Sequence, residues 1–253
     1  MRGISAAFVA QMDERKELFM CTWKEQKRKA VTFSYDDGVT QDIRLIEMLN
    51  RYNLKCTFNL NSERLGENGC LIRENQRIAQ YKIWPQDVRE IYAGHEVAVH
   101  TLTHPNLTTL DEQEIIRQVE EDRLKLSDLA GYEVVGMAYP CGGVNNDDRV
   151  AKIIREHTGV RYSRTITSTH SFELQENLYR FNPSVYHLEW EKMMEMAEQF
   201  VMMKPETPQI FYIWGHSFEM DYNNTYWDKL EELCKRISGR EDTFYGTNRE
   251  VLL

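Results

Sequence analysis

Short apolar runs rich in β-branched and aromatic residues recur along the chain, and amphipathic stretches separate most of them. The runs lie at 30–33, 56–60, 97–99, 134–139, 160–166 and 210–214. Helical spacing of apolar residues is found at 42–51, 85–93, 111–130, 147–157, 190–203 and 226–237. This alternation of strand and helix patterns predicts an α/β fold built on a parallel sheet or barrel.

The stretch 111–130 gives the clearest helix prediction. Thr109 is placed to cap it, Glu112 to complete a capping box, and Gly131 to stop it. In folds of this kind functional side chains gather in the loops at the carboxyl ends of the strands. The polar residues directly after the apolar runs are therefore the ones to examine.

Composition and charge narrow the functional classes. The chain has 253 residues, a length at which α/β barrels form one domain, so we expect a single domain over 1–253. A net charge of -9 argues against a surface that holds nucleic acid. No apolar run reaches the length of a membrane span.

Cysteine usage and the first residues indicate the compartment. The five cysteines are an odd number without a CxxC pair, which argues against a disulfide framework. Residues 1–21 lack the apolar core of a signal peptide, because charged residues at 13–16 interrupt it. As the sequence stands we expect a cytoplasmic protein. A chain whose leader had been trimmed would look the same and would work outside the cell.

Three of the expected strands end in residue types that bind metals. Asp36 and Asp37 follow the run at 30–33, His100 and His104 follow 97–99, and His216 follows 210–214. Each feature alone has an ordinary explanation, since Asp and Gly favour turns and two histidines four residues apart arise by chance.

Together these residues predict a catalytic metal site. Four residues apart on a helical turn, His100 and His104 would point the same way and grip one cation, and one carboxylate would complete the set. Three protein ligands leave coordination positions open, which is typical of a catalytic site. The second carboxylate could then accept a proton from the attacking water, and His216 could protonate the leaving group.

The sequence resembles the polysaccharide deacetylase family, also called carbohydrate esterase family four, whose members remove acetyl groups from chitin, peptidoglycan and related glycans. The resemblance spans about residues 30–253 and includes TFSYDDG at 32–38 and HTLTH at 100–104. It implies that Asp36 is the catalytic base and that Asp37, His100 and His104 are metal ligands. It also implies a distorted, incompletely closed (β/α) barrel.

The family's third motif, Arg-x-Pro-aromatic-Gly, is only partly matched by AYPCG at 138–142. The resemblance assigns the main-chain amide of Cys141 to the oxyanion, with Tyr139 beside it in the substrate site. Ala138 replaces the arginine that usually pairs with the catalytic base. Arg164, in the next expected strand, could supply the missing guanidinium from another direction.

The last motif, a hydrophobic strand ending in His, is matched by YIWGHS at 212–217 and makes His216 the general acid. Trp214 would line the acetyl pocket or belong to the core. A further family motif, with an Asp and an aromatic residue, has no clear match. The candidates for its position are Asn182, Tyr186, His187 and Trp190.

These features predict a metal-dependent hydrolase that removes acetyl groups from an acetylated glycan or amino sugar. Two histidines and a carboxylate suit zinc first, and also cobalt, nickel or manganese. One alternative on the same scaffold is an amidase or imidase acting on small amides. A second is a carbohydrate-binding protein without activity, which the loss of the motif-three arginine would favour. The glycan, its chain length and the oligomeric state stay open.

Overall fold

The computed structural model describes Trp23, residues 27–73 and residues 76–253. The strands are β1 (Lys29–Asp36), β2 (Cys56–Leu60), β3 (Asn68–Arg73), β4 (Gln76–Tyr81), β5 (Glu96–Val99), β6 (Gly136–Ala138), β7 (Tyr162–Arg164), β8 (Val185–Tyr186), β9 (Gln209–Gly215) and β10 (Thr243–Tyr245). The α-helices are α2 (Gln41–Arg51), α3 (Val88–Ile91), α4 (Glu112–Ile116), α5 (Asp122–Ala130), α6 (Asp148–His157), α7 (Trp190–Met202), α8 (Tyr226–Ile237) and α9 (Asn248–Leu252). Shorter helical turns are η2 (Ser62–Arg64), η3 (Pro85–Asp87), η4 (Leu107–Thr109), η5 (Arg117–Glu121), η6 (Leu178–Arg180) and η7 (Ser217–Tyr222).

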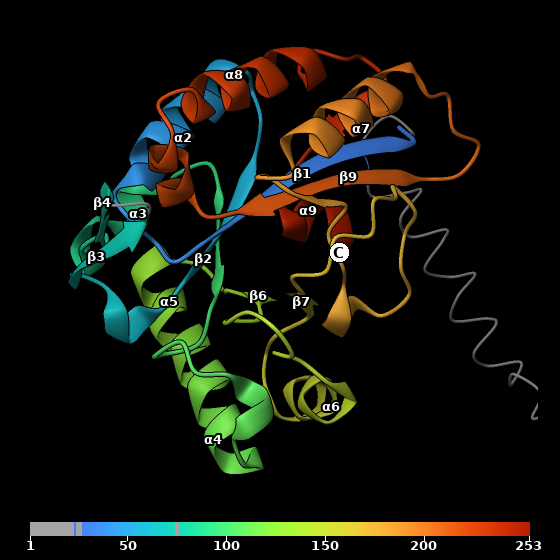
Figure 1. The fold of residues 1–253 in the computed structure, drawn as a ribbon. Coiled ribbons are helices and arrows are strands. Elements are labelled where there is room, and N and C mark those ends of the chain that lie inside the picture. Colours follow the sequence, from blue (N-terminus) through green and yellow to red (C-terminus); the bar gives the residue numbers. More distant parts are fainter. Residues whose placement is uncertain (1–22, 24–26, 74–75) are drawn as a thin grey trace, which may run out of the picture.

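Eight parallel strands form one curved sheet in the order β7-β6-β5-β2-β1-β9-β8, and β10 pairs with the start of β1. Within the described residues β7 and β8 do not pair, so the sheet stays open. The expectation of an incompletely closed (β/α) barrel is confirmed. Figure 1 shows α2, α7 and α8 near β1 and β9, and α4, α5 and α6 near β6 and β7. Helices α2, α5, α6, α7 and α8 all contribute residues to one hydrophobic core on the same face of the curved sheet.

The central strand β1 explains how the fold aims its polar residues. All eight residues of β1 are buried. Phe33 and Tyr35 belong to the hydrophobic core, whereas Ser34 and Asp36 hydrogen-bond to one Asn59 side chain. Because side chains alternate along a strand, the polar set lies on the face opposite that core. Asp36 is the last residue of that polar row.

The predicted helix over 111–130 exists, but it begins and continues differently from the prediction. The Asp111 carboxylate, not the Thr109 hydroxyl, accepts from the Glu114 amide at 2.9 Å, so the expected capping box is wrong. Thr109 ends the preceding turn η4. The stop at Gly131 is confirmed by its left-handed φ of 81°. Between α4 and α5 lies a π-helical segment, η5, which the apolar spacing did not predict.

The sequence pattern missed the antiparallel hairpin β3–β4, which is inserted between η2 and η3. Its strands are largely exposed, with Ile78 as the buried exception, so they carry no strong apolar alternation. The hairpin joins the main body through the isolated bridge between Val39 and Lys82. This insertion brings Lys82 to the loop that follows β1.

Among the described residues, no helix combines the length and apolarity that crossing a bilayer requires. Cys56, Cys70, Cys141 and Cys234 are free thiols. The N-terminal stretch at 1–21, on which the signal-peptide prediction rests, lies outside the described residues, as does Cys21.

Candidate active site

The ends of four strands bring the predicted site residues to one edge of the sheet. Asp36 is the last residue of β1 and Arg164 the last of β7, while His100 directly follows β5 and His216 directly follows β9. These strands are parallel, so their carboxyl ends share that edge and the loops there can converge on one point.

Asp37, His100 and His104 form a cluster that fits a metal. One ligand atom from each lies within 4.8 Å of the other two. His100 Nδ1 lies 2.9 Å from the carbonyl oxygen of Ala138, which can only accept a hydrogen bond. Nδ1 therefore carries the proton and Nε2 keeps a lone pair.

The protonation of the cluster also favours a cation. Burial lowers the pKa of His100 to about 4, so the ring is neutral at pH 7. Burial alone would raise the pKa of Asp37, but Lys82 and the nearby histidines hold it well below its usual range. Two neutral imidazoles and an ionised carboxylate are a donor set suited to zinc and related divalent metals.

The loop that carries the two histidines is not the helical turn expected from their spacing. Thr101 and His104 have φ of 68° and 65°, left-handed values that a right-handed helix does not contain. The Asn61 side chain instead donates to the carbonyl oxygens of His100 and Thr101. The two rings still meet, with centroids 4.9 Å apart, because hydrogen bonds to the loop replace those of a helix.

The π-helical segment η5 supports this loop. The amide of Leu102 donates to the Gln118 carbonyl oxygen at 3.0 Å, and the amide of Thr103 donates to Gln118 Oε1 at 3.1 Å. A π turn widens the helix and shifts its hydrogen-bond register. Gln118, which holds the histidine loop, belongs to this π-helical segment.

Lys82 is a site residue that the sequence reasoning missed. Its Nζ donates to the Asp37 carbonyl oxygen at 2.6 Å and lies 3.3 Å from Asp37 Oδ1. Asp37 has a φ of 85°, and the lysine holds both its backbone and its carboxylate. Lys82 lies 45 residues from Asp37 and belongs to no motif, so only the hairpin insertion reveals it.

Arg164 lies against the carboxylate of Asp36. Its Nη2 is 2.5 Å from each Asp36 oxygen, and Asn59 Nδ2 donates to Oδ1 at 2.8 Å. Both partners are fully buried or nearly so. Burial would raise the pKa of Asp36, but the Arg164 guanidinium outweighs it and holds the pKa below its usual range. The carboxylate is therefore ionised at neutral pH.

The three residues assigned to substrate binding differ in their surroundings. Tyr139 is fully buried and its hydroxyl donates to the Tyr179 carbonyl oxygen at 2.7 Å, so its side chain belongs to the core and does not line the site. Cys141 has a φ of 69° and its Sγ lies 3.5 Å from the His104 carbonyl oxygen. Within the described residues nothing accepts a hydrogen bond from the Cys141 amide, which leaves it available as a donor.

Trp214 is 7 % exposed and packs its ring 4.5 Å from the Arg164 guanidinium carbon. The Tyr186 ring lies 4.8 Å from it, measured between centroids. The buried indole Nε1 of Trp214 has no hydrogen-bond partner among the described residues. The ring therefore helps to hold Arg164, and its place in an acetyl pocket stays a prediction.

Glu219 is the second site residue that the motifs did not reveal. Its Oε2 lies 3.0 Å from His216 Nδ1 and accepts from the His216 amide at 3.1 Å. Burial would lower the pKa of His216, but Glu219 and then Asp36 raise it to about 9. His216 Nε2 faces Asp36 Oδ2 at 4.0 Å. Glu219 thus orients His216 and keeps it protonated.

Two of the unassigned motif candidates complete this network. His187 is fully buried, with Nε2 2.6 Å from the same Glu219 Oε2 and Nδ1 3.0 Å from the Tyr35 hydroxyl. The Tyr186 hydroxyl donates to Glu219 Oε1. Glu219 therefore receives hydrogen bonds on both oxygens. The only sequence signal for Glu219 was its position as a carboxylate three residues after His216.

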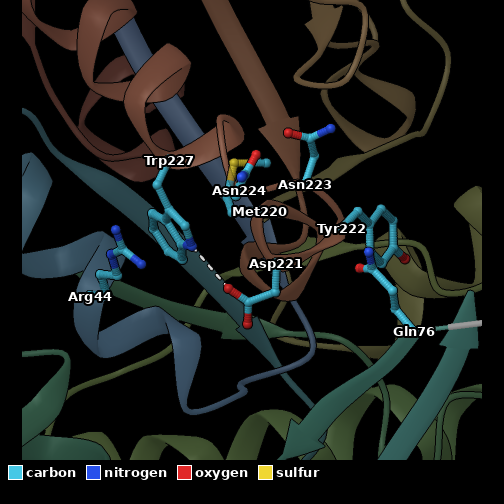
Figure 2. A pocket seen from close by; sticks show the side chains of 8 residues that line it. All are labelled: Arg44, Gln76, Met220, Asp221, Tyr222, Asn223, Asn224 and Trp227. Carbon is cyan, nitrogen blue, oxygen red and sulfur yellow. Dashed lines mark hydrogen bonds between the residues drawn. The ribbon is translucent and has the colours of Figure 1, made fainter.

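A separate hollow of about 560 Å³ lies beside η7, which begins directly after His216. Figure 2 shows Arg44 and Trp227 on one side of it and Tyr222 and Gln76 on the other, with the Trp227 indole directed at Asp221. The hollow contains none of the metal-cluster residues.

Comparisons with known proteins place the chain in a family. Residues 24–162, more than half of the chain, match the model of the polysaccharide deacetylase family. The peptidoglycan-N-acetylglucosamine deacetylase PgdA of Listeria monocytogenes is 27% identical over 124 residues, which are 48% of this chain and 23% of that protein. The chain thus spans less than a quarter of the relative's length.

Two solved structures share the fold at low identity. Puue allantoinase matches with a TM-score of 0.66 and 11% identity over 91% of both chains. A probable polysaccharide deacetylase from Pseudomonas aeruginosa PAO1 matches with a TM-score of 0.65 and 12% identity, over 89% of this chain and 90% of the other. The family match, which includes the Asp37, His100 and His104 cluster, shows that this chain belongs to the polysaccharide deacetylase family.

Proposed function

We propose that this protein is a metal-dependent hydrolase that removes acetyl groups from N-acetylated sugars. The observation that carries the proposal is geometric: Asp36, held by Arg164, and His216, held by Glu219, face each other at 4.0 Å at the strand edge that also carries the Asp37, His100 and His104 cluster. The pKa of Asp36 is held below its usual range while that of His216 is raised to about 9. Neighbouring groups whose environments separate their pKa values in this way are suited to act as base and acid.

Asp37, His100 and His104 are the residues that would hold the metal, and zinc suits their donor set. When bound, such a metal supplies Lewis-acid polarisation of a carbonyl and a lowered pKa of water. Lys82 fixes the Asp37 side of this set, and the Ala138 carbonyl fixes the His100 tautomer. The metal ligands are thus positioned before any cation arrives.

The protein groups divide the proton transfers between them. Asp36, ionised and held by Arg164, accepts the proton of the attacking water. His216, protonated and held by Glu219, gives a proton to the leaving amine. The free amide of Cys141 donates to the oxygen on which negative charge develops. The products are acetate and a free amino sugar.

The deciding experiment measures acetate released from N-acetylglucosamine oligomers by the purified protein, after chelation and after zinc is restored. We expect release only with metal. The substrate panel should also contain cyclic imides and simple amides, because an amidase on this scaffold would act on those alone. Oligomer binding without acetate release, in metal-loaded protein, would replace the proposal with a carbohydrate-binding function.

A further inference from the structure

Trp84 combines a large aromatic side chain with unusual exposure. It is 55% exposed, whereas Trp23, Trp214 and Trp227 are buried. Scattered exposed aliphatic residues are ordinary on protein surfaces. An exposed indole beside a site that handles ligands is not, because tryptophan covers the largest apolar area of any side chain.

Gly66 fixes the ring of Trp84 in place. The position that a Cβ atom would take on Gly66 lies 2.8 Å from Trp84 Cε3, so any larger residue would displace the ring. Gly66 also has a φ of 80°, which favours glycine. The indole therefore rests on bare backbone on one side and stays exposed elsewhere.

Backbone hydrogen bonds connect the residues next to this ring to the loop that carries Asp37. The Gly66 amide donates to the Ile83 carbonyl oxygen, and the Ile83 amide donates to that of Gly38, each at 2.9 Å. Lys82, two residues before Trp84, contacts Asp37. Two residues of extended chain span roughly 7 Å, so the indole is attached close to the cluster.

The segment that contains Gly66 is also connected to the loop that carries the two histidines. Two residues before Gly66 the turn η2 ends, and within η2 the amide of Glu63 donates to the Leu102 carbonyl oxygen at 3.2 Å. Leu102 lies between the two metal-ligand histidines. Trp84 thus stands where the segments supporting Asp37 and His104 meet.

The hollow beside η7 offers no comparable aromatic face. The Arg44 guanidinium carbon lies 4.3 Å from the centroid of Trp227, and that of Arg73 lies 4.5 Å from the centroid of Tyr222 (Figure 2 shows the first pair). Both rings are already covered by cations. Among the described residues no charged group and no second ring stacks on Trp84.

We propose that Trp84 is a substrate-binding residue, on whose exposed indole a sugar ring of a glycan stacks while a neighbouring acetylated sugar occupies the metal cluster. The C–H face of a pyranose is apolar and matches an aromatic face. This inference rests on the proposed function and deepens it. Stacking on Trp84 makes the protein selective for oligosaccharides over single amino sugars.

The test compares Trp84→Ala and Trp84→Phe with the natural protein on two substrates, an N-acetylglucosamine tetramer and a small aryl acetate. Covering an exposed aromatic face is worth about a tenfold change in affinity. We expect Trp84→Ala to raise KM for the tetramer about tenfold with kcat little changed. Trp84→Phe should recover most of the loss, and the aryl acetate should be cleaved equally by all three.

Ile72→Ala is the matched control, because Ile72 is 75% exposed and lies on the hairpin that precedes Trp84. It should leave the KM for the tetramer unchanged. Binding of the tetramer should also reduce the quenching of tryptophan fluorescence by acrylamide in the natural protein, and the reduction should be smaller in Trp84→Phe. This readout needs no turnover. An active natural protein with an unchanged KM in Trp84→Ala would reject the stacking role alone. Absence of acetate release from every glycan would reject the proposed function, and fluorescence protection would still decide on Trp84.

Discussion

Replacing Arg164 by Met removes a buried cation and leaves its partner carboxylate in place. Asp36 would keep the hydrogen bond from Asn59 at 2.8 Å but lose both contacts at 2.5 Å. Arg164 is fully buried and Asp36 is 2% exposed, so water cannot replace the guanidinium. Breaking such a buried pair costs about 3–5 kcal/mol of unfolding free energy while the remaining charge stays ionised.

The cost of this substitution depends on pH, and its sign follows from the pKa of Asp36. In the natural protein the folded pKa is lowered, so the pair contributes stability above the unfolded value of about 3.9 and loses it as pH falls through the folded pKa. In Arg164→Met the Asn59 hydrogen bond and the nearby histidines remain, but the strongest opponent of burial is gone, so the folded pKa rises. The variant then loses stability as pH rises through that raised value. We expect a deficit near its full size at pH 7.5 and a much smaller one at pH 5.

Urea unfolding of chelator-treated protein at the two pH values measures this difference. Arg180→Met is the matched control, because Arg180 pairs with the 92% exposed Asp148 and such pairs are worth at most about 1 kcal/mol. The acidic limb of kcat/KM should also move to higher pH in Arg164→Met, with bound metal unchanged. An equal deficit at both pH values would refute the assignment of Arg164 as the cation that keeps Asp36 ionised.

Three further outcomes follow from the site. His104→Ala should abolish binding of about one divalent metal per chain, measured by elemental analysis, and retained metal would overturn the ligand set. Asp36→Asn should keep the metal while kcat falls about 100-fold or more, and parallel loss of metal would mean that Asp36 is a ligand. Glu219→Gln should lower the pKa of His216 from about 9 and move the alkaline limb of kcat/KM to lower pH, whereas an unmoved limb would show that another group orients the acid.

The elements that the sequence predicted well are those whose burial leaves a pattern. The strand at 56–60 and the helix at 226–237 have the predicted bounds, because strand β2 is buried throughout and helix α8 buries one face. β8 has two residues and β10 three, too few for any periodicity. Their pairing depends on the neighbouring strands β9 and β1, which lie far away in the sequence.

The site divides in the same way. The metal cluster was predictable because local spacing and strand ends place Asp37, His100 and His104, even though the loop between the histidines is not helical. Lys82 was not, because its contact depends on how an exposed hairpin docks. A residue that acts from a distant segment leaves no local spacing to read.

Ala138 and Arg164 show how the fold accommodates the departure in the third motif. Strands β6 and β7 are parallel neighbours, and Ala138 is the register partner of Arg164. Register partners lie about 4.8 Å apart, so an arginine on either strand starts from nearly the same level of the barrel. The small side chain of Ala138 leaves space beside the long one of Arg164, whose Nε reaches Ser34 at 3.1 Å on the way to Asp36. Arg164 therefore places a guanidinium against Asp36, the residue proposed as base, from the strand next to Ala138, and Ala138 alone is no argument against the proposed activity.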